Sequence, residues 1–197
     1  LETFKVDITQ TFIDQQTRYL ESHRPDGKPD ILQQIEHGAL NVLAQVENIG
    51  HPVRGIIVPN LHQFHHFGDA TTETDNLPYN PNLKPYETDG KSSGTMDDRW
   101  AFTNREPFLD YYTIATLAAA NRALKDFNKP LAEKCLSLAL KLWNEEQNMP
   151  KKEDNPRMAV WGKSIELNAV LQLYITTKQE QYSTRFQELI WPLLDEF

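Results

Sequence analysis

Apolar residues recur at three- and four-residue steps along the second half of this 197-residue chain. That spacing places them on one face of an α-helix, so it predicts amphipathic helices that pack against one another. Short breaks at 128–130 and 177–180 separate neighbouring helices, and connections of that length favour antiparallel helical hairpins. We therefore expect four helices here, at about 108–127, 130–147, 162–177 and 181–197.

The first half of the chain carries one strong helical pattern and one weaker pattern. Residues 30–48 are clearly amphipathic, and glycine and proline at 50–52 end the segment. Residues 3–22 have irregular, partly helical apolar spacing, and we predict a helix there as well. Two prolines and a glycine within 23–30 separate the two segments. Because no region is rich in strand patterns, we predict an all-α fold of stacked helical hairpins.

The stretch from about 50 to 106 differs in composition from the rest of the chain. It contains five prolines and, after Gly50, four glycines, and only residues 55–61 have the pattern of a short extended segment. Connections this long are uncommon in compact domains and, when ordered, are usually binding or active-site loops. Its aromatic residues argue against a disordered linker, because linkers are poor in aromatics. We therefore predict one long structured loop.

Composition excludes several classes of function. The formal net charge is −8, whereas general nucleic-acid binding needs a basic face. The mean hydropathy is −0.60, and no run of about eighteen apolar residues could form a membrane span. The one cysteine, Cys135, excludes an internal disulfide framework and a cysteine-based zinc site. Common nucleotide-binding, serine-hydrolase and zinc-protease motifs are also missing, and we expect no cofactor and no metal site.

The first candidate group in the loop consists of three histidines and nearby acidic residues. His62, His65 and His66 have Asp69 and Asp75 close by in sequence. Imidazoles and carboxylates at such spacing can bind a borderline metal ion. They can equally line a polar ligand cleft, or be ordinary hydrogen-bonded loop residues. The spacing alone does not decide among these three interpretations, and we assign no metal ligands here.

The second candidate group is the run Asp97-Asp98-Arg99-Trp100. Adjacent residues point in different directions, so the two aspartates are a poor general acid–base pair. An arginine beside a carboxylate keeps it ionised, which suits hydrogen bonding to hydroxyl groups better than proton donation. A tryptophan offers a flat apolar face on which a sugar ring can stack. The alternative is that Trp100 anchors the loop in the core.

Several segments, in order along the chain, are similar to parts of one enzyme family. Residues 27–45 are GKPDILQQIEHGALNVLAQ, and residues 97–104 are DDRWAFTN and precede an alanine-rich pattern at 113–124. These segments resemble a bacterial branch of glycoside hydrolase family 9, the cellulase-type β-glucanases with an (α/α)6 barrel. Further segments with the same resemblance are 54–69, 131–143 and 164–182.

The resemblance implies that the chain is the middle part of a six-hairpin toroid. It also implies an exported parent protein, whether periplasmic, cell-surface or secreted, that hydrolyses β-glucan by an inverting mechanism. The family's catalytic base pair lies in an Asp-Ala-Gly-Asp motif that residues 1–26 lack, and its general acid lies past the last residue of this chain. The resemblance therefore assigns no catalytic residue here, and we expect the chain alone to be inactive.

What the resemblance implies for this chain is a role in sugar binding. Trp100 would be the stacking platform, and the candidates for binding hydroxyl groups are Asp98, Arg99, His62 and His66. We also expect the chain to be a piece of a longer protein, because it ends within an apolar run, and we expect an incomplete barrel to self-associate. Two alternatives remain: a non-catalytic carbohydrate-binding module that uses the same loop, and a helical scaffold that binds proteins.

Overall fold

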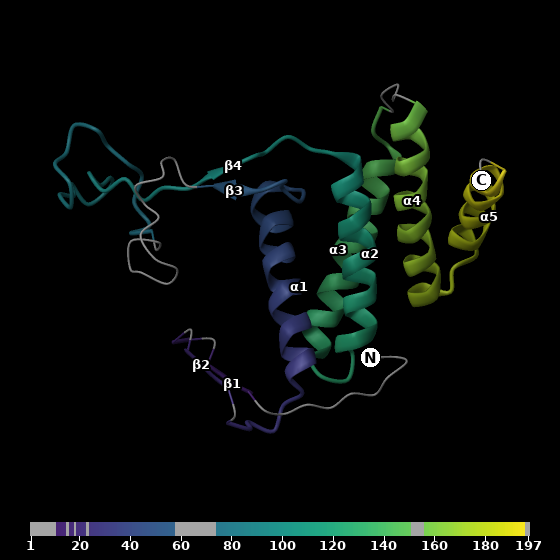
Figure 1. Cartoon of the computed structure of the whole chain (residues 1–197), viewed down its shortest axis with the longest axis horizontal. Coiled ribbons are helices and arrows are strands. Elements are labelled where there is room, and N and C mark those ends of the chain that lie inside the picture. The colour runs from purple at the N-terminus through teal and green to yellow at the C-terminus, as the bar shows by residue number, and fades with distance from the viewer. Residues whose placement is uncertain are drawn as a thin grey trace. The chain divides into compact units, whose positions relative to one another are not determined.

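The computed structural model describes residues 11–14, 16–17, 19–22, 24–57, 74–150 and 156–195. The chain divides into two compact units, one formed by Leu1–Pro52 with Arg105–Phe197 and the other by Val53–Asn104. The described part is mostly helical and adds only two small strand pairs, as expected for an all-α chain (Figure 1). Within it, no helix has the length and apolar character needed to cross a membrane.

Five helices make up most of the first unit. Helix α2 (Pro107–Leu124) packs against α3 (Lys129–Gln147) and also against α4 (Pro156–Thr177). Helix α4 packs in turn against α5 (Glu180–Leu194), and α1 (Asp30–Ile49) lies against α2 and α3. The two predicted helical hairpins, α2–α3 and α4–α5, are therefore present (Figure 1).

The core of this unit lies where these helices meet. Alanines at 115, 118 and 120 of α2 are buried, and their small side chains let the neighbouring helices approach closely. Burying one leucine side chain contributes about 1.5–3 kcal/mol, so packing outweighs intrinsic helix propensity. Burial also raises the pKa of the Cys135 thiol to about 11, which keeps it protonated, as expected for a small core residue. The largest fully buried side chains include Leu43, Ile114, Leu117, Leu124, Leu142 and Leu173.

One arginine ties α2 to α4 across the core edge. Arg122 on α2 donates from Nη1 to Thr176 Oγ1 and from Nη2 to Gln172 Oε1, both at 2.7 Å. The hydroxyl of Thr176 in turn donates to the carbonyl oxygen of Gln172, one turn earlier in α4, at 2.7 Å. Because hydrogen bonds to a guanidinium are stronger than neutral ones, this group fixes the register of the two helices.

The predicted helix at 3–22 is wrong in its described part; residues 3–10 lie outside the described residues. Strand β1 (Thr11–Asp14) pairs antiparallel with β2 (Tyr19–Ser22). Asp14 Oδ1 accepts hydrogen bonds from the backbone N–H groups of Gln16 at 2.9 Å and Thr17 at 3.3 Å. A carboxylate that bonds to the backbone two and three residues on stabilises a turn, and this turn interrupts the helical spacing.

Helix boundaries differ most from expectation at α4. This helix begins at Pro156 rather than at 162, so the predicted loop is shorter. Proline suits the first helical position, because its missing N–H has no partner in the helix there. Helix α2 ends at Leu124 rather than at 127, while the predicted start of α1, α3 and α5 lies within one residue of the observed start.

The second unit has little regular structure, yet its backbone is extensively hydrogen bonded. Strand β3 (Ile56–Ile57) pairs antiparallel with β4 (Trp100–Ala101). Between them, the Ser93 N–H donates to the Pro78 carbonyl at 2.9 Å, and the Asn80 N–H donates to the Ser93 carbonyl at 2.7 Å. The predicted loop is therefore structured within 74–99; of the expected extended segment at 55–61, residues 58–61 lie outside the described residues.

One glycine in this loop has no room for a side chain. A Cβ added at Gly94 would lie 2.0 Å from the carbonyl oxygen of Lys84 and 2.8 Å from that of Leu83. These backbone atoms cannot move aside without opening the loop. A Cβ at Gly55, in the same unit, would meet only the Phe102 ring, at 3.8 Å.

We predict that Gly94→Ala opens the loop locally. Hydrogen exchange at the Ser93 and Asn80 amides should become at least about tenfold faster, the equivalent of about 1.4 kcal/mol of lost local stability. Gly55→Ala is the matched control and should leave both amides unchanged. Equal protection in Gly94→Ala and the wild type would contradict this prediction.

Candidate functional site

An open depression in the second unit contains part of the predicted site. Its volume is about 600 Å³, and its lining residues are Tyr79, Met96, Asp98, Arg99 and Trp100. The structure thus brings together three of the five residues selected from the sequence. Tyr79 and Met96 were not among them. Tyr79 stands 19 residues before Asp98, and no local pattern connects the two positions.

Trp100 is held by a strand and presents its ring to solvent. Its backbone pairs with Ile57 in the β3–β4 ladder, and the N–H of Phe102 donates to the Gly55 carbonyl at 3.0 Å. Its side chain is 67% exposed, so the alternative that Trp100 anchors the loop in the core is wrong. The short ladder therefore holds an exposed aromatic ring on a defined backbone.

The two adjacent aspartates have different roles in the structure. Asp97 is buried, and its Oδ2 accepts a hydrogen bond from the Asp75 N–H, so it holds the loop together. Asp98 Oδ2 accepts from the Tyr79 N–H at 2.7 Å. A carboxylate has two oxygens with several acceptor positions. Asp98 can therefore bond to the loop backbone and still accept a hydrogen bond from a ligand. This arrangement places Tyr79 in the lining beside Trp100.

The chemical character of the depression is mixed. An indole ring, a phenol and a thioether supply apolar surface, while one carboxylate and one guanidinium supply polar contacts. Such a lining can pack against the apolar face of a ring and hydrogen bond to polar groups at its edge. Arg99 also has an interaction partner within the protein, so it is not an isolated charge.

The histidine group cannot be placed beside this depression. His62 and His66, together with His65 and Asp69, lie outside the described residues. Asp75 is described, and its backbone N–H bonds to Asp97. In the part of the chain that the structure describes, no group of three or more His, Cys, Asp or Glu side chains is arranged to hold a metal ion.

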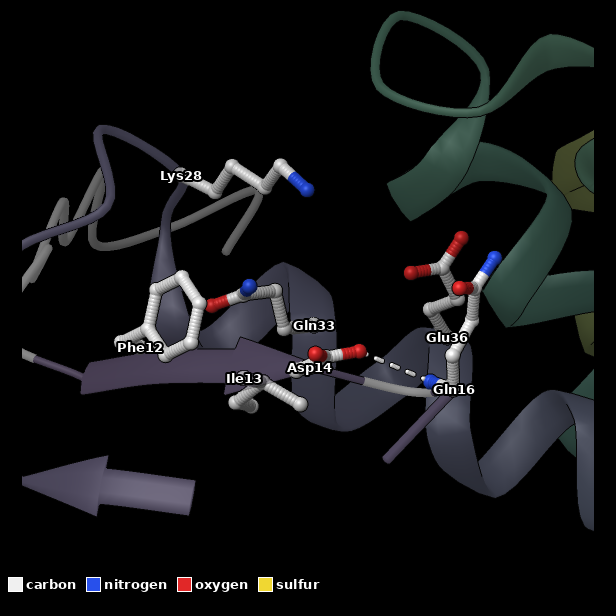
Figure 2. Close-up of a pocket in the computed structure, with 7 residues that line it drawn as sticks. All are labelled: Phe12, Ile13, Asp14, Gln16, Lys28, Gln33 and Glu36. Atoms are coloured by element: carbon white, nitrogen blue, oxygen red, sulfur yellow. Dashed lines mark hydrogen bonds between the residues drawn. The ribbon is translucent and has the colours of Figure 1, made fainter. Parts of the chain in front are cut away.

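A second depression, of about 520 Å³, lies between β1 and the start of α1 (Figure 2). Asp14 and Gln16 line it and are joined by the turn hydrogen bond described above. Gln33 donates from Nε2 to Asp26 at 2.9 Å, and Glu36 accepts a short hydrogen bond from Asn128. Most of its polar side chains are therefore already engaged in hydrogen bonds within the protein. Sequence reasoning missed this depression because it predicted a helix at 3–22.

A third feature is a group of buried and partly buried charged side chains in the first unit. Arg105 donates from Nε to Asp110 Oδ2 at 2.6 Å and from Nη1 to Glu145 Oε2 at 3.1 Å. Burial lowers the pKa of Arg105, but hydrogen bonds and charges of Asp110 and Glu145 raise it overall. Arg185 on α5 donates two hydrogen bonds, at 2.7 and 2.9 Å, to Glu166 on α4. None of these side chains lines either depression.

Comparison with known proteins found no matching family model, no matching curated protein and no matching solved structure. The resemblance to glycoside hydrolase family 9 therefore rests on the sequence segments alone.

We predict that Asp98→Ala loosens Tyr79, because the backbone N–H loses its acceptor. Amide exchange at Tyr79 should become about fivefold faster, corresponding to a net hydrogen-bond contribution of about 1 kcal/mol. Asp98→Asn keeps an acceptor oxygen of similar shape and should retain most of the protection. If Asp98→Ala and Asp98→Asn behaved alike, the carboxylate would not be what holds Tyr79.

Proposed function

We propose that this chain is the middle part of a β-glucan hydrolase of the glycoside hydrolase family 9 type, and that its second unit binds the sugar chain. The observation that carries the proposal is the exposed Trp100 ring, which lines one depression together with Asp98 and Arg99. The ordered sequence resemblance supplies the family, the substrate class and the expectation of export.

The chemistry of the depression suits a carbohydrate. A sugar ring has a face of C–H groups and a rim of hydroxyl groups. An indole ring can pack against the C–H face of the sugar. Both apolar surfaces are then removed from water, which contributes favourable free energy. Asp98 accepts hydrogen bonds and Arg99 donates them, so the pair can bond to sugar hydroxyl groups that act as donors or as acceptors. We propose that His62 and His66 add polar contacts to the same sugar chain.

The role we propose is binding rather than bond cleavage. Inverting glycosidases use two carboxyl groups about 6.5–9.5 Å apart. Asp98 is the one carboxylate among the described lining residues, and Asp97 is buried and bonded to the loop backbone. This chain would therefore orient the glucan while other parts of the parent enzyme supply the acid and the base.

We also propose the finer architecture, in which α2–α3 and α4–α5 are consecutive hairpins of an (α/α)6 toroid. In such a toroid, alternate helices form an inner ring and touch one another. The packing of α2 against α4, as well as against its own hairpin partner α3, supports this arrangement.

Oligosaccharide titration tests the binding proposal. With the 197-residue chain, β-glucan oligosaccharides should change tryptophan emission saturably, and Trp100→Ala should weaken binding by about tenfold or more. Trp161→Ala is the matched control, because Trp161 is 42% exposed but lies on α4, outside the depression. Equal losses in the two variants, or no response to any oligosaccharide, would refute the proposal and favour a protein-binding scaffold.

The same protein separates binding from catalysis. We predict no measurable release of reducing sugar from carboxymethyl cellulose or mixed-linkage glucan, because no catalytic acid–base pair is assigned to this chain. Turnover that survives further purification would show that the chain contains its own catalytic carboxylates.

We further propose that the isolated chain self-associates. Trp191 and Leu194 on α5 are both exposed, and such large apolar side chains favour contact between copies. Sedimentation velocity should show a concentration-dependent shift to larger species. A monomer at all concentrations would contradict this expectation.

A further inference from the structure

Two carboxyl groups in the first unit are buried without enough cations to neutralise them. Asp110 on α2 is 0% exposed, and Glu146 on α3 is 7% exposed. Asp110 Oδ2 is bonded to Arg105, but its Oδ1 has no hydrogen-bond partner, and neither has Glu146 Oε2. Leaving such atoms unpaired in the interior is costly, so the arrangement requires an explanation.

The carboxyl groups around this pair outnumber the cations. Arg105 bonds to Asp110 and Glu145 through Nε and Nη1, and its Nη2 is buried without a hydrogen-bond partner. Arg185 bonds to Glu166 and Glu188. Among the described residues, Glu146 forms no ion pair of its own. Glu166 on α4 adds further negative charge near it. The site therefore holds an excess of negative charge, which one proton would relieve.

The neighbouring hydrogen-bonding groups also indicate that one of the two carboxyl groups is protonated. After burial, the Asp110 carboxyl group is the next cause that raises the pKa of Glu146. The two carboxyl groups therefore lie close together, and two ionised carboxylates cannot bond to each other. Tyr111, the remaining titratable neighbour on α2, accepts from Gln147 at 3.3 Å, and its pKa is raised by burial and then by the charges of Glu166 and Glu146. The phenol thus stays neutral and supplies no counter-charge.

We propose that Asp110 and Glu146 form a proton-sharing pair, in which neutral Glu146 donates a hydrogen bond to the Asp110 carboxylate and ties α2 to α3. The bond satisfies both carboxyl groups at once. It also preserves the ion pair between Asp110 and Arg105. Arg105 is the residue at which the chain re-enters the first unit, just before α2. Loss of the proton would leave two negative groups side by side and weaken this junction.

The direction of the pH effect follows from the protonation states. Burial, the Asp110 hydrogen bond and the Asp110 charge raise the pKa of Glu146 to about 7, whereas the unfolded chain has a value of 4.5. Between these values the folded state binds more protons than the unfolded state. The stability from this group is therefore full below pH 4.5 and is lost as the pH rises through about 7.

Two other aspartates have pKa shifts of the opposite sign. Hydrogen bonds, from Thr17 to Asp14 and from Lys91 to Asp89, lower the pKa values of those two groups. The informative quantity is the difference in stability between wild type and variant, which removes contributions common to both.

The experiment is urea unfolding of the full chain at several pH values between about 5.5 and 8. Over this range the wild-type folding constant should fall about 20-fold further than that of Glu146→Gln, whose amide can still donate to Asp110. Glu133→Gln, which changes an exposed glutamate on the same helix, is the matched control and should keep the wild-type slope. Parallel profiles for the wild type and Glu146→Gln would overturn the proposal, because Glu146 would then be ionised throughout, with Arg105 Nη2 as its partner.

Infrared spectroscopy of the wild type tests the proton directly, even if a variant fails to fold. A carbonyl band of a protonated carboxylic acid should be present near pH 6 and disappear by about pH 8.5. Its absence near pH 6 would also overturn the proposal.

Discussion

The packing of α2 against two other helices is the constraint on which the first unit depends. Helix α2 contacts α3 through its hairpin and α4 across the core, and its alanines permit both approaches. Because α2 must satisfy two partners, the groups at its ends are held in place as well. Arg122 near one end bonds to α4, while Asp110 near the other bonds to Arg105.

Much of this fold could be predicted because it depends on short-range patterns. The apolar spacing of residues 30–48 and 130–147 is helical throughout, and both helices were observed. The segment 11–22 could not be predicted in this way, since one carboxylate, Asp14, reverses the chain within an apolar run. The start of α4 was missed because residues 148–161, which contain two prolines and a charged run, were assigned to a loop, although Pro156 is a recognised signal for a first turn.

The candidate site was predictable in its composition but not in its arrangement. The run from Asp97 to Trp100 showed which residue types were available. It did not show that Asp97 is buried, nor that Asp98 reaches back to Tyr79. These contacts join positions about twenty residues apart through irregular backbone, for which no periodicity exists. The pairing of Asp110 with Glu146 likewise depends on how two helices pack.

The hydrogen bond from Tyr79 to Asp98 has a consequence for any ligand of the depression. A free aspartate side chain rotates, and a ligand that binds it must stop that rotation at a cost in entropy. Here the backbone N–H of Tyr79 already orients the carboxylate. The entropy of ordering the side chain is therefore lost when the loop folds and not when a ligand binds. It follows that the affinity of the depression for a ligand depends on the stability of the loop that contains Tyr79 and Asp98.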